Sequence, residues 1–373
     1  MPRRRATRSR RPTPARRTAR TTSTPPRQAT RTRTPRPTPG PRSRTRPDLP
    51  STTTGAGHRI AGDRPHPLFP FHDLTRADIM STKILDRITA DPDQQERYAR
   101  IALACLTTPG EPNTPAVHLT GTNGPAVVQH TLDTLPPAIA ERTVIDALDS
   151  AADGTHRVLI PTDPEWPAGL DDLGPERPVA LWTSGDLDLL TDTPARAVTI
   201  TGARAATSYG DHIAAELAHD LTRTGHSIVT GGAYGIDAAA TRATLAASGH
   251  PIVVLASGID RPYPAGNTGL LHQVTEHGLV LTETPPSLAP TRSRFVARTR
   301  ILAALAAATV IVEAGARSGA PQVAHTAHRL ARTVGAVPGP ITSTTSTGCH
   351  LLIQAGIARL ITSADDLAPT VDE

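Results

Sequence analysis

Two glycine-bearing loops carry residue types suited to holding an anion. The first contains Gly202 and Arg204, and the second runs from Gly231 to Asp237 with the sequence GGAYGID. Glycines let the backbone approach a ligand, and the N–H groups at the start of a following helix carry partial positive charge. An arginine pairs with phosphate through two parallel hydrogen bonds, which lysine cannot do. The loops therefore predict a phosphate site, although a glycine after a strand also serves simply to turn the chain.

The residues around these loops predict how they are positioned. A β-branched run at 198–200 precedes the first loop, and an Ala/Leu pattern at helical spacing follows it at 212–221. A second apolar run, 227–229, precedes the second loop, and another helix opens at 235–237. Repetition of strand, loop and helix indicates parallel strands joined by helical crossovers. We therefore predict an α/β fold with an extended Rossmann-like, mostly parallel sheet, preceded by a small helical domain and a disordered basic N-terminal tail.

Strand and helix candidates alternate through the main domain. The strands are expected at 197–201, 227–230, 251–256, 279–283, 309–313, 333–336 and 357–361. The helices are expected at 212–223, 236–248, 267–277, 295–306, 320–331 and 346–355. Ligands of open α/β sheets bind at the carboxyl ends of the strands, so we expect the loops 202–210, 231–237, 257–264 and 314–319 to converge on one site.

Seven sequence blocks, in order, resemble the DNA-processing protein A family, DprA, also called Smf. They begin with the two loops above and continue with LASGIDRPYPAGN (255–267), TETPP (282–286), RFVARTRILAAL (294–305), VIVEAGARSGA (310–320) and AVPGPITSTTSTGCHLLIQAG (336–356). The resemblance runs from about Asp163 to Leu367. It implies a single-stranded-DNA-binding recombination mediator that protects incoming DNA and loads a RecA-type recombinase in DNA uptake and natural transformation.

The resemblance and the loop positions together give the candidate nucleic-acid-binding residues. These are Gly202, Arg204, Ser208, Tyr209, Gly210, Gly231, Gly232, Tyr234, Gly235, Ile236, Asp237, Arg261, Tyr263, Asn267, Arg298, Arg300, Arg317, Ser318 and Gly319. Arg204 is expected to be the leading phosphate contact, beside the N–H groups of 208–211 and 235–237. Tyr209, Tyr234 and Tyr263 are candidates for stacking on single bases.

Several positions depart from the family pattern, among them Ala265 and Gly266 of the Tyr-Pro-x-x-Asn loop, where larger or charged residues often occur. Tyr234 stands in place of a common arginine, Thr241 in place of a frequent histidine, and Thr299 within the family's Arg-Asn-Arg. Loss of an arginine should weaken phosphate contact, whereas Tyr234 offers a ring for stacking. A divergent paralogue that keeps the fold as a non-binding scaffold is therefore one alternative.

Three acids, Asp237, Glu283 and Glu313, stand where strands end or a helix opens, and they form a candidate acid/base set. The structural interpretation is stronger: Asp237 satisfies helix N–H groups, and the glutamates pair with nearby arginines. Ser318 has no recognisable base or oxyanion partners. We therefore predict a non-enzymatic protein with no catalytic residue, metal or cofactor. The alternative is a nucleotide-binding or nucleotide-processing Rossmann enzyme related to the lysine-decarboxylase-like phosphoribohydrolases, although their Pro-Gly-Gly-x-Gly-Thr signature is missing.

The basic charge of the chain is concentrated at its start. Sixteen arginines and one acid give residues 1–50 a charge of +15, so the remaining residues carry about −10 of the chain's net +5. A segment so poor in apolar residues should be disordered, and it is a candidate polycationic arm for nucleic acid. Met80 begins a more ordinary sequence and is a second candidate start, in which case the tail is not translated.

The predicted domain boundaries follow these composition shifts. They are a tail at 1–79, a small helical domain of helix-hairpin-helix or SAM-like type at 80–150, a connector at 151–190 packing on the main domain, the DprA-type Rossmann-like domain at 191–368, and a tail at 369–373. Gly121–Gly124 is a candidate hairpin turn of the helical domain, with a plain interhelical turn as the alternative.

Cysteine usage and hydropathy bear on the compartment. Cys105 and Cys349 lie in different predicted domains, with no zinc spacing or disulfide framework, which favours a reducing cytoplasm. No run approaches the roughly 20 apolar residues of a membrane span.

The resemblance also implies a homodimer formed through the Rossmann-like domain. The predicted helix around 301–305 is rich enough in Ala, Leu and Ile to bury a face against a second copy. The same pattern suits an intramolecular core, and the sequence leaves the two alternatives open.

Overall fold

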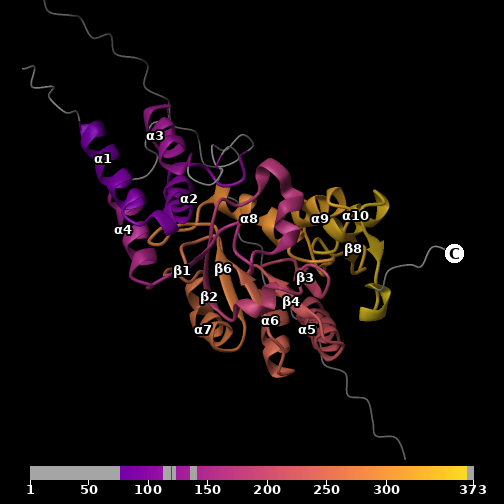
Figure 1. Ribbon diagram of the computed structural model, residues 1–373. Helices are drawn as coiled ribbons and strands as arrows, with labels where there is room; N and C mark the ends of the chain where they lie inside the picture. Colours follow the sequence, from indigo (N-terminus) through magenta and orange to yellow (C-terminus); the bar gives the residue numbers. More distant parts are fainter. Residues whose placement is uncertain (1–75, 112–118, 120–122, 135–140, 368–373) are drawn as a thin grey trace, which may run out of the picture. The chain divides into compact units, whose positions relative to one another are not determined.

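The structure, a computed structural model, describes residues 76–111, 119, 123–134 and 141–367 (Figure 1). The predicted tails at 1–79 and 369–373 therefore lie outside the described residues, except that helix α1, Arg76–Thr89, begins inside the first of them. The boundary expected at residue 79 thus falls within a helix. Residues 121 and 122 of the candidate hairpin turn at 121–124 also lie outside the described residues.

Nine strands form one sheet in the described part of the chain (Figure 1). They are β1 (Arg157–Leu159), β2 (Leu181–Gly185), β3 (Ala197–Thr201), β4 (Ser227–Thr230), β5 (Ile252–Val254), β6 (Leu279–Thr282), β7 (Ala308–Ile311), β8 (Thr333–Ala336) and β9 (Arg359–Leu360). The strand order is β1-β2-β6-β5-β4-β3-β7-β8-β9. The strands from β3 to β9 run parallel, whereas β2 is antiparallel to both β1 and β6. The predicted mostly parallel sheet is confirmed.

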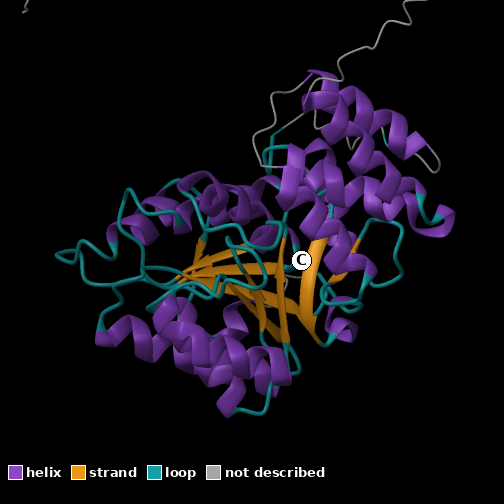
Figure 2. Ribbon diagram, turned by 90° about the vertical axis from the view of Figure 1, so that its left-hand side faces the viewer, coloured by secondary structure: helices purple, strands orange, loops and turns teal. Residues whose placement is uncertain are grey.

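Helices cover both faces of this sheet (Figure 2). Besides α1, the α-helices in the described part of the chain are α2 (Gln95–Leu106), α3 (Gly124–Thr134), α4 (Glu141–Ala152), α5 (Ser208–Arg223), α6 (Ile236–Ala246), α7 (Thr268–His277), α8 (Arg292–Ala304), α9 (Ala320–Arg329) and α10 (Thr347–Gln354). Leu217 of α5 and Ile236 of α6 pack on Val198 and Ile200, the side chains that β3 directs to one face. The alternate residue of β3, Thr199, donates its hydroxyl to the Leu302 carbonyl of α8 at 2.7 Å. Alternation along β3 therefore separates α5 and α6 on one face from α8 on the other.

The helices α1 to α4 share a core with the first two strands. Ile84, Ile101 and Val144 belong to the same buried cluster as Val158 and Trp182, which stand on β1 and β2. Between these strands lies a 3₁₀ segment, Ala168–Glu176. The connector expected at 151–190 therefore includes β1, this 3₁₀ segment and β2, and it joins the small helical region to the edge of the main sheet.

Element boundaries differ from expectation where side-chain caps decide them. The helix expected from residue 212 begins at Ser208, because the Thr207 hydroxyl accepts the Gly210 amide at 3.2 Å. The helix expected from 295 begins at Arg292, where Thr291 accepts the Arg294 amide at 3.3 Å. A hydroxyl at the N-cap satisfies an amide that lacks an intrahelical partner, and so extends the helix toward the loop. None of the described helices is long and apolar enough to cross a membrane.

Candidate functional site

The loops that follow β3, β4 and β7 pack closely against one another. A Cβ atom added at Gly202 would lie 2.7 Å from the Glu313 carbonyl oxygen and 2.7 Å from Ile236 Cγ1. Gly235 has φ of 70° and lies so close to the Ala203 carbonyl that a side chain has no room. Real Cβ atoms do not approach backbone this closely, and positive φ is costly for other residues. These glycines therefore let three strand ends meet.

The carboxylate of Asp237 fills the centre of the glycine loop after β4. It accepts hydrogen bonds from the amides of Gly231 at 3.1 Å and Ala233 at 3.2 Å, and from the Thr201 hydroxyl at 2.8 Å. The Gly232 amide is bound to Thr230 Oγ1 at 3.3 Å. The protein's own acid thus occupies the position that an anion takes in a glycine-rich phosphate loop.

Two further amides expected to face a ligand are also engaged within the protein. Gly210 donates to Thr207, and the Ile236 amide donates to the Ala203 carbonyl at 3.2 Å. The expectation that phosphate is cradled by these N–H groups is therefore wrong for Gly210 and Ile236. A phosphate here has to be held mainly by side chains.

Arg298 lies beneath the glycine loop and balances Asp237. Its guanidinium donates to the Gly231 carbonyl and, at 3.2 Å, to the Val254 carbonyl, while its Nε is buried without a partner among the described residues. Burial lowers the pKa of Arg298 to about 10, opposed by the charge of Asp237 and reinforced by that of Arg204. Burial raises the pKa of Asp237, opposed by the Arg298 charge and its three hydrogen bonds. The opposite charges of these two side chains therefore partly offset each other across the glycine loop.

Arg204, Tyr234, Tyr263 and Phe295 surround a small recess above Arg298. The Arg204 guanidinium carbon lies 4.4 Å from the centre of the Phe295 ring, and that of Arg298 lies 5.2 Å from it. Tyr263 meets Phe295 edge to face, with ring centres 5.8 Å apart. Both distances from the guanidinium groups are within the range of a cation–π contact, so the aromatic ring holds two cations at one place.

The recess itself is small. Its volume is about 30 Å³, close to one water molecule's share of liquid volume. Tyr234 and Tyr263 are 47% and 43% exposed, and the Tyr234 hydroxyl accepts the Gly266 amide at 3.1 Å. A whole base does not fit inside the recess. The recess has room for a phosphate oxygen at Arg204, and a base can stack outside it on an exposed tyrosine ring.

The structure therefore brings together five of the predicted residues, Arg204, Gly231, Tyr234, Tyr263 and Arg298. Sequence reasoning missed Phe295, which organises the two arginines. The available signal was its spacing of three from Arg298, which places both on one face of α8.

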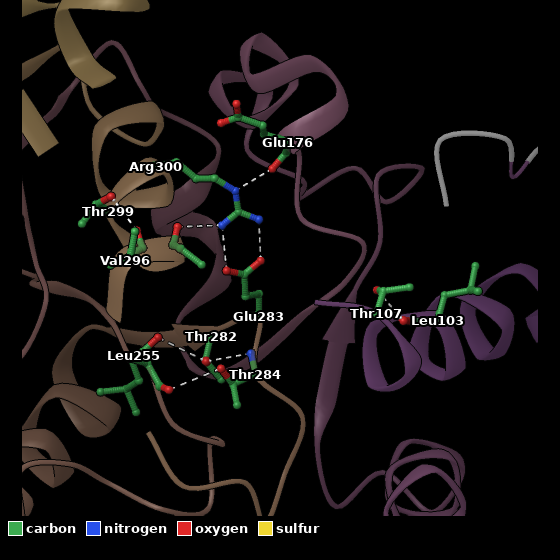
Figure 3. Close-up of polar contacts among 12 residues, drawn as sticks. Leu103, Thr107, Glu176, Leu255, Thr282, Glu283, Thr284, Val296, Thr299 and Arg300 are labelled. Carbon is green, nitrogen blue, oxygen red and sulfur yellow. Dashed lines mark hydrogen bonds and ion pairs between the residues drawn. The ribbon is translucent and has the colours of Figure 1, made fainter. Parts of the chain in front are cut away.

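Arg300 does not line this recess, and Figure 3 shows its side chain against Glu283 and Glu176 instead. It forms two hydrogen bonds with the Glu283 carboxylate, at 2.7 and 2.6 Å, and donates to the carbonyls of Glu176 and Ala297 at 2.6 and 2.8 Å. The side chains of Arg300 and Glu283 are only 6% and 9% exposed. The pairing of Glu283 with an arginine agrees with the structural interpretation of that acid, and it removes Arg300 from the cations that face solvent.

The remaining predicted residues lie around the recess or serve its framework. Asn267 is buried and donates to the carbonyls of Gly232 and Ala233 at 3.0 and 3.1 Å, which fixes the glycine loop. The Tyr209 hydroxyl donates to the Pro338 carbonyl at 2.8 Å. Arg261 is exposed and donates to the Ser287 carbonyl at 3.2 Å.

The loop after β7 takes no part in lining the recess, so the expected convergence of four loops is reduced to three. Arg317, Ser318 and Gly319 are exposed there. Ser208 is exposed at the first turn of α5. Glu313 accepts the Thr207 amide at 2.9 Å and its hydroxyl at 2.7 Å, and thereby anchors the start of α5.

Fold and recess together define a Rossmann-type α/β protein that presents a small cationic and aromatic site at the carboxyl ends of β3, β4 and β5. The chain belongs to the family described as DNA recombination-mediator protein A, which matches residues 157–372.

Known proteins of this family resemble the chain in sequence and in structure. The putative DNA processing protein DprA of Mycobacterium tuberculosis is 46% identical over 241 residues, which cover 60% of this chain and 61% of that relative. DNA processing protein A of Streptococcus pneumoniae has a solved structure with TM-score 0.60 and 28% identity, covering 74% of this chain and 96% of that one. The protein from Helicobacter pylori, solved to study its single-stranded DNA binding mode, gives TM-score 0.51 and 29% identity, covering 57% and 93%. The match to the curated M. tuberculosis relative thus spans about three fifths of its length.

Proposed function

We propose that this protein binds single-stranded DNA as a recombination mediator. The observation that carries the proposal is the recess in which Phe295 holds Arg204 and Arg298 between two exposed tyrosines. Arg204 is exposed and supplies the phosphate contact, while Tyr234 and Tyr263 supply ring faces. The relative from H. pylori, whose solved structure concerns its single-stranded DNA binding mode, supports single-stranded DNA as the ligand.

The aromatic faces favour single-stranded over duplex DNA. Bases in a duplex are stacked on their neighbours, whereas an unpaired base presents its face to a protein ring. One arginine and two exposed rings suit one or two nucleotides, so contact is local and not spread over a broad basic surface.

The acids of the site favour binding over catalysis. Asp237 is bound to two amides and a hydroxyl, Glu283 to Arg300, and Glu313 to Thr207. Each carboxylate therefore already serves the protein's own donors, and acting as a general base would require breaking these contacts.

Substitution of Arg204 tests the proposal. Arg204→Ala removes the phosphate contact, so single-strand affinity should fall by about 1–3 kcal/mol. The slope of log affinity against log salt should become shallower by about 0.7 than that of the parent protein. Fluorescence anisotropy with a labelled thymidylate strand measures both quantities.

Arg242→Ala is the matched control, because Arg242 is an exposed arginine of α6 and its loss changes the net charge equally. It should leave affinity within about twofold, since exposed charges beyond a Debye length are screened. Equal losses in the two variants would show that Arg204 acts only through net charge, and would contradict the proposed site.

We further propose that the bound strand is passed to a RecA-type recombinase in the cytoplasm, during DNA uptake. Family membership supports this role, and Cys105 and Cys349 are both unpaired and buried, as suits a reducing compartment. Faster assembly of the recombinase on a strand already bound by this protein is the expected result. An unchanged rate of assembly would contradict it.

We also propose a homodimer, on a different surface from the one first expected. Ile301, Leu302 and Leu305 are at most 1% exposed and belong to the intramolecular core, so they are not available to a partner. Large apolar side chains are exposed instead near the end of the chain, with Leu351 of α10 at 50% and Leu360 of β9 at 51%. Light scattering of the full chain should give a dimer mass, and Leu351→Glu should reduce it to a monomer.

A further inference from the structure

A second cavity, of about 360 Å³, lies between α7, the β2–β6 strand pair and the loop after β5. Its apolar wall contains Leu255, Leu271 and Val280, which are each 3% exposed, together with Ile259 and Pro262. Pockets for small ligands begin at about 300 Å³ and are mostly apolar with a few polar groups. The cavity is therefore large enough for a ring system that the recess at Arg204 cannot admit.

The polar groups of this cavity come from seven side chains, which are Thr155, His156, Thr183, Ser184, Thr268, His272 and Thr275. The Nδ1 atom of His156 is buried and has no hydrogen-bond partner in the described part of the chain. An unsatisfied buried polar atom costs about 1–3 kcal/mol, so a ligand that bonds to it gains correspondingly. An imidazole nitrogen donates or accepts according to its tautomer and thus suits the edge of a heterocycle.

The charge of the lining excludes an anion as the main ligand. The residues that line this cavity, all in the described part of the chain, include no arginine or lysine. A phosphate placed there would lose its hydration without a cation in exchange. Apolar walls with hydrogen-bonding groups at the rim instead match a neutral, flat heterocycle.

The loop after β5 connects this cavity with the recess. Ile259 and Pro262 line the cavity, and the next two residues, Tyr263 and Pro264, line the recess. Consecutive Cα atoms are about 3.8 Å apart, so the two hollows lie on either side of a few residues. Arg261 belongs to the same loop and is exposed.

We propose that this cavity receives one unpaired nucleobase of the strand whose phosphate is held at Arg204. The inference rests on the proposed function, and it adds a base-binding subsite to it. Arg261, which uses one of its five N–H donors on Ser287, faces the phosphate between the two nucleotides. The apolar wall encloses the ring, and His156 bonds to its edge.

A comparison of two strands tests the subsite. One is a thymidylate strand, and the other has the same length and phosphates but abasic sugars throughout. The full-length protein should bind the base-bearing strand at least about tenfold more tightly, since stacking and enclosure of a base add to phosphate binding. The N-terminal tail is common to all proteins compared and contacts phosphates in both strands alike.

Filling the cavity should remove most of this preference. Thr275→Trp places a large ring at the half-buried position of α7 that lines the cavity, whereas Gln273→Trp places the same ring at an exposed position of α7 outside it. Thr275→Trp should reduce the preference at least about fivefold, and Gln273→Trp should leave it unchanged. If Thr275→Trp does not fold, by circular dichroism, His156→Ala provides the second variant and should also reduce the preference.

The outcomes separate this inference from the proposed function. Failure of the parent protein to bind either strand would refute the proposed function. Equal reduction by Thr275→Trp and Gln273→Trp, or a preference that survives both Thr275→Trp and His156→Ala, would overturn the subsite while leaving phosphate binding at Arg204 in place. The same base could also come from a free nucleoside, and calorimetry with thymidine tests this alternative. If thymidine binds, Thr275→Trp abolishes this binding and the strand preference stays intact, the cavity is a site for a free nucleoside. That result would overturn its assignment to the strand.

Discussion

Replacement of Asp237 should lower the stability of the fold, because this buried acid holds the glycine loop from inside. Asp237→Ala leaves the amides of Gly231 and Ala233 and the hydroxyl of Thr201 without their acceptor. It also removes the negative charge that favours the charged form of Arg298. A buried polar group left without a partner costs about 1–3 kcal/mol, so we expect a loss of at least about that size in the free energy of unfolding.

Asp237→Asn separates the hydrogen bonds from the charge. Both amides point at one carboxylate oxygen, Oδ2, and the Thr201 hydroxyl points at the other. An asparagine can keep its oxygen toward the amides and donate its NH₂ to the hydroxyl, which rotates to accept. Only the charge is lost, and burial already disfavours that charge, so Asp237→Asn should cost less than Asp237→Ala.

The pH dependence of this difference has a defined sign. Burial raises the pKa of folded Asp237 above its unfolded value, so protonation favours the folded state. The stability that protonated Asp237 contributes to the folded state is complete below the unfolded pKa of about 3.9. It declines as pH rises through the folded pKa. The stability advantage of the wild type over Asp237→Asn should therefore be greatest at acidic pH and smaller at neutral pH.

Urea unfolding and strand binding, measured on the same proteins, test this reasoning. Asp211→Asn is the control, because Asp211 is also in the first turn of a helix but is exposed, and it should cost less than about 1 kcal/mol. Loss of a negative charge near Arg204 should keep single-strand affinity of Asp237→Asn at or above that of the wild type. Equal stability of Asp237→Ala and the wild type would refute the assigned role.

Two further predictions concern buried groups away from the recess. Glu283→Gln should lower the free energy of unfolding by about 3–5 kcal/mol, because the Arg300 charge remains buried without its bidentate partner; a change below about 1 kcal/mol in urea unfolding would show that the pair is dispensable. Burial raises the pKa of both Cys105 and Cys349 to about 12, so neither should react with iodoacetamide in the native protein at about pH 8, whereas both should react in urea. Mass spectrometry reads the labelling, and rapid native labelling of either thiol would contradict its burial.

The alternation of elements could be predicted from local pattern because each strand and helix buries one face. The strand at Ala197–Thr201 and the helix ending at Arg223 agree with expectation. Starts of helices were less predictable, since they depend on caps such as Thr207, which is itself held by Glu313 from a loop about 100 residues later.

Of the candidate site, the sequence predicted several of the residues that meet at the recess. Glycines after strands and an arginine in the first loop predicted an anion-binding site, and Arg204, Tyr234 and Tyr263 indeed lie together. Residue types and spacing carry this information because the topology of a parallel sheet brings the strand ends to one edge.

Only the tertiary structure decided which charges face the solvent. Arg298 and Arg300 are two residues apart on α8, and nothing in their local sequence distinguishes them. A turn of about 100° per residue on a helix sends one beneath the glycine loop and the other to Glu283. In the same way, Asp237 turned out to occupy the glycine loop because a buried carboxylate requires donors and the loop amides require an acceptor. Such pairings join residues distant in the sequence, so they follow from packing and not from local pattern.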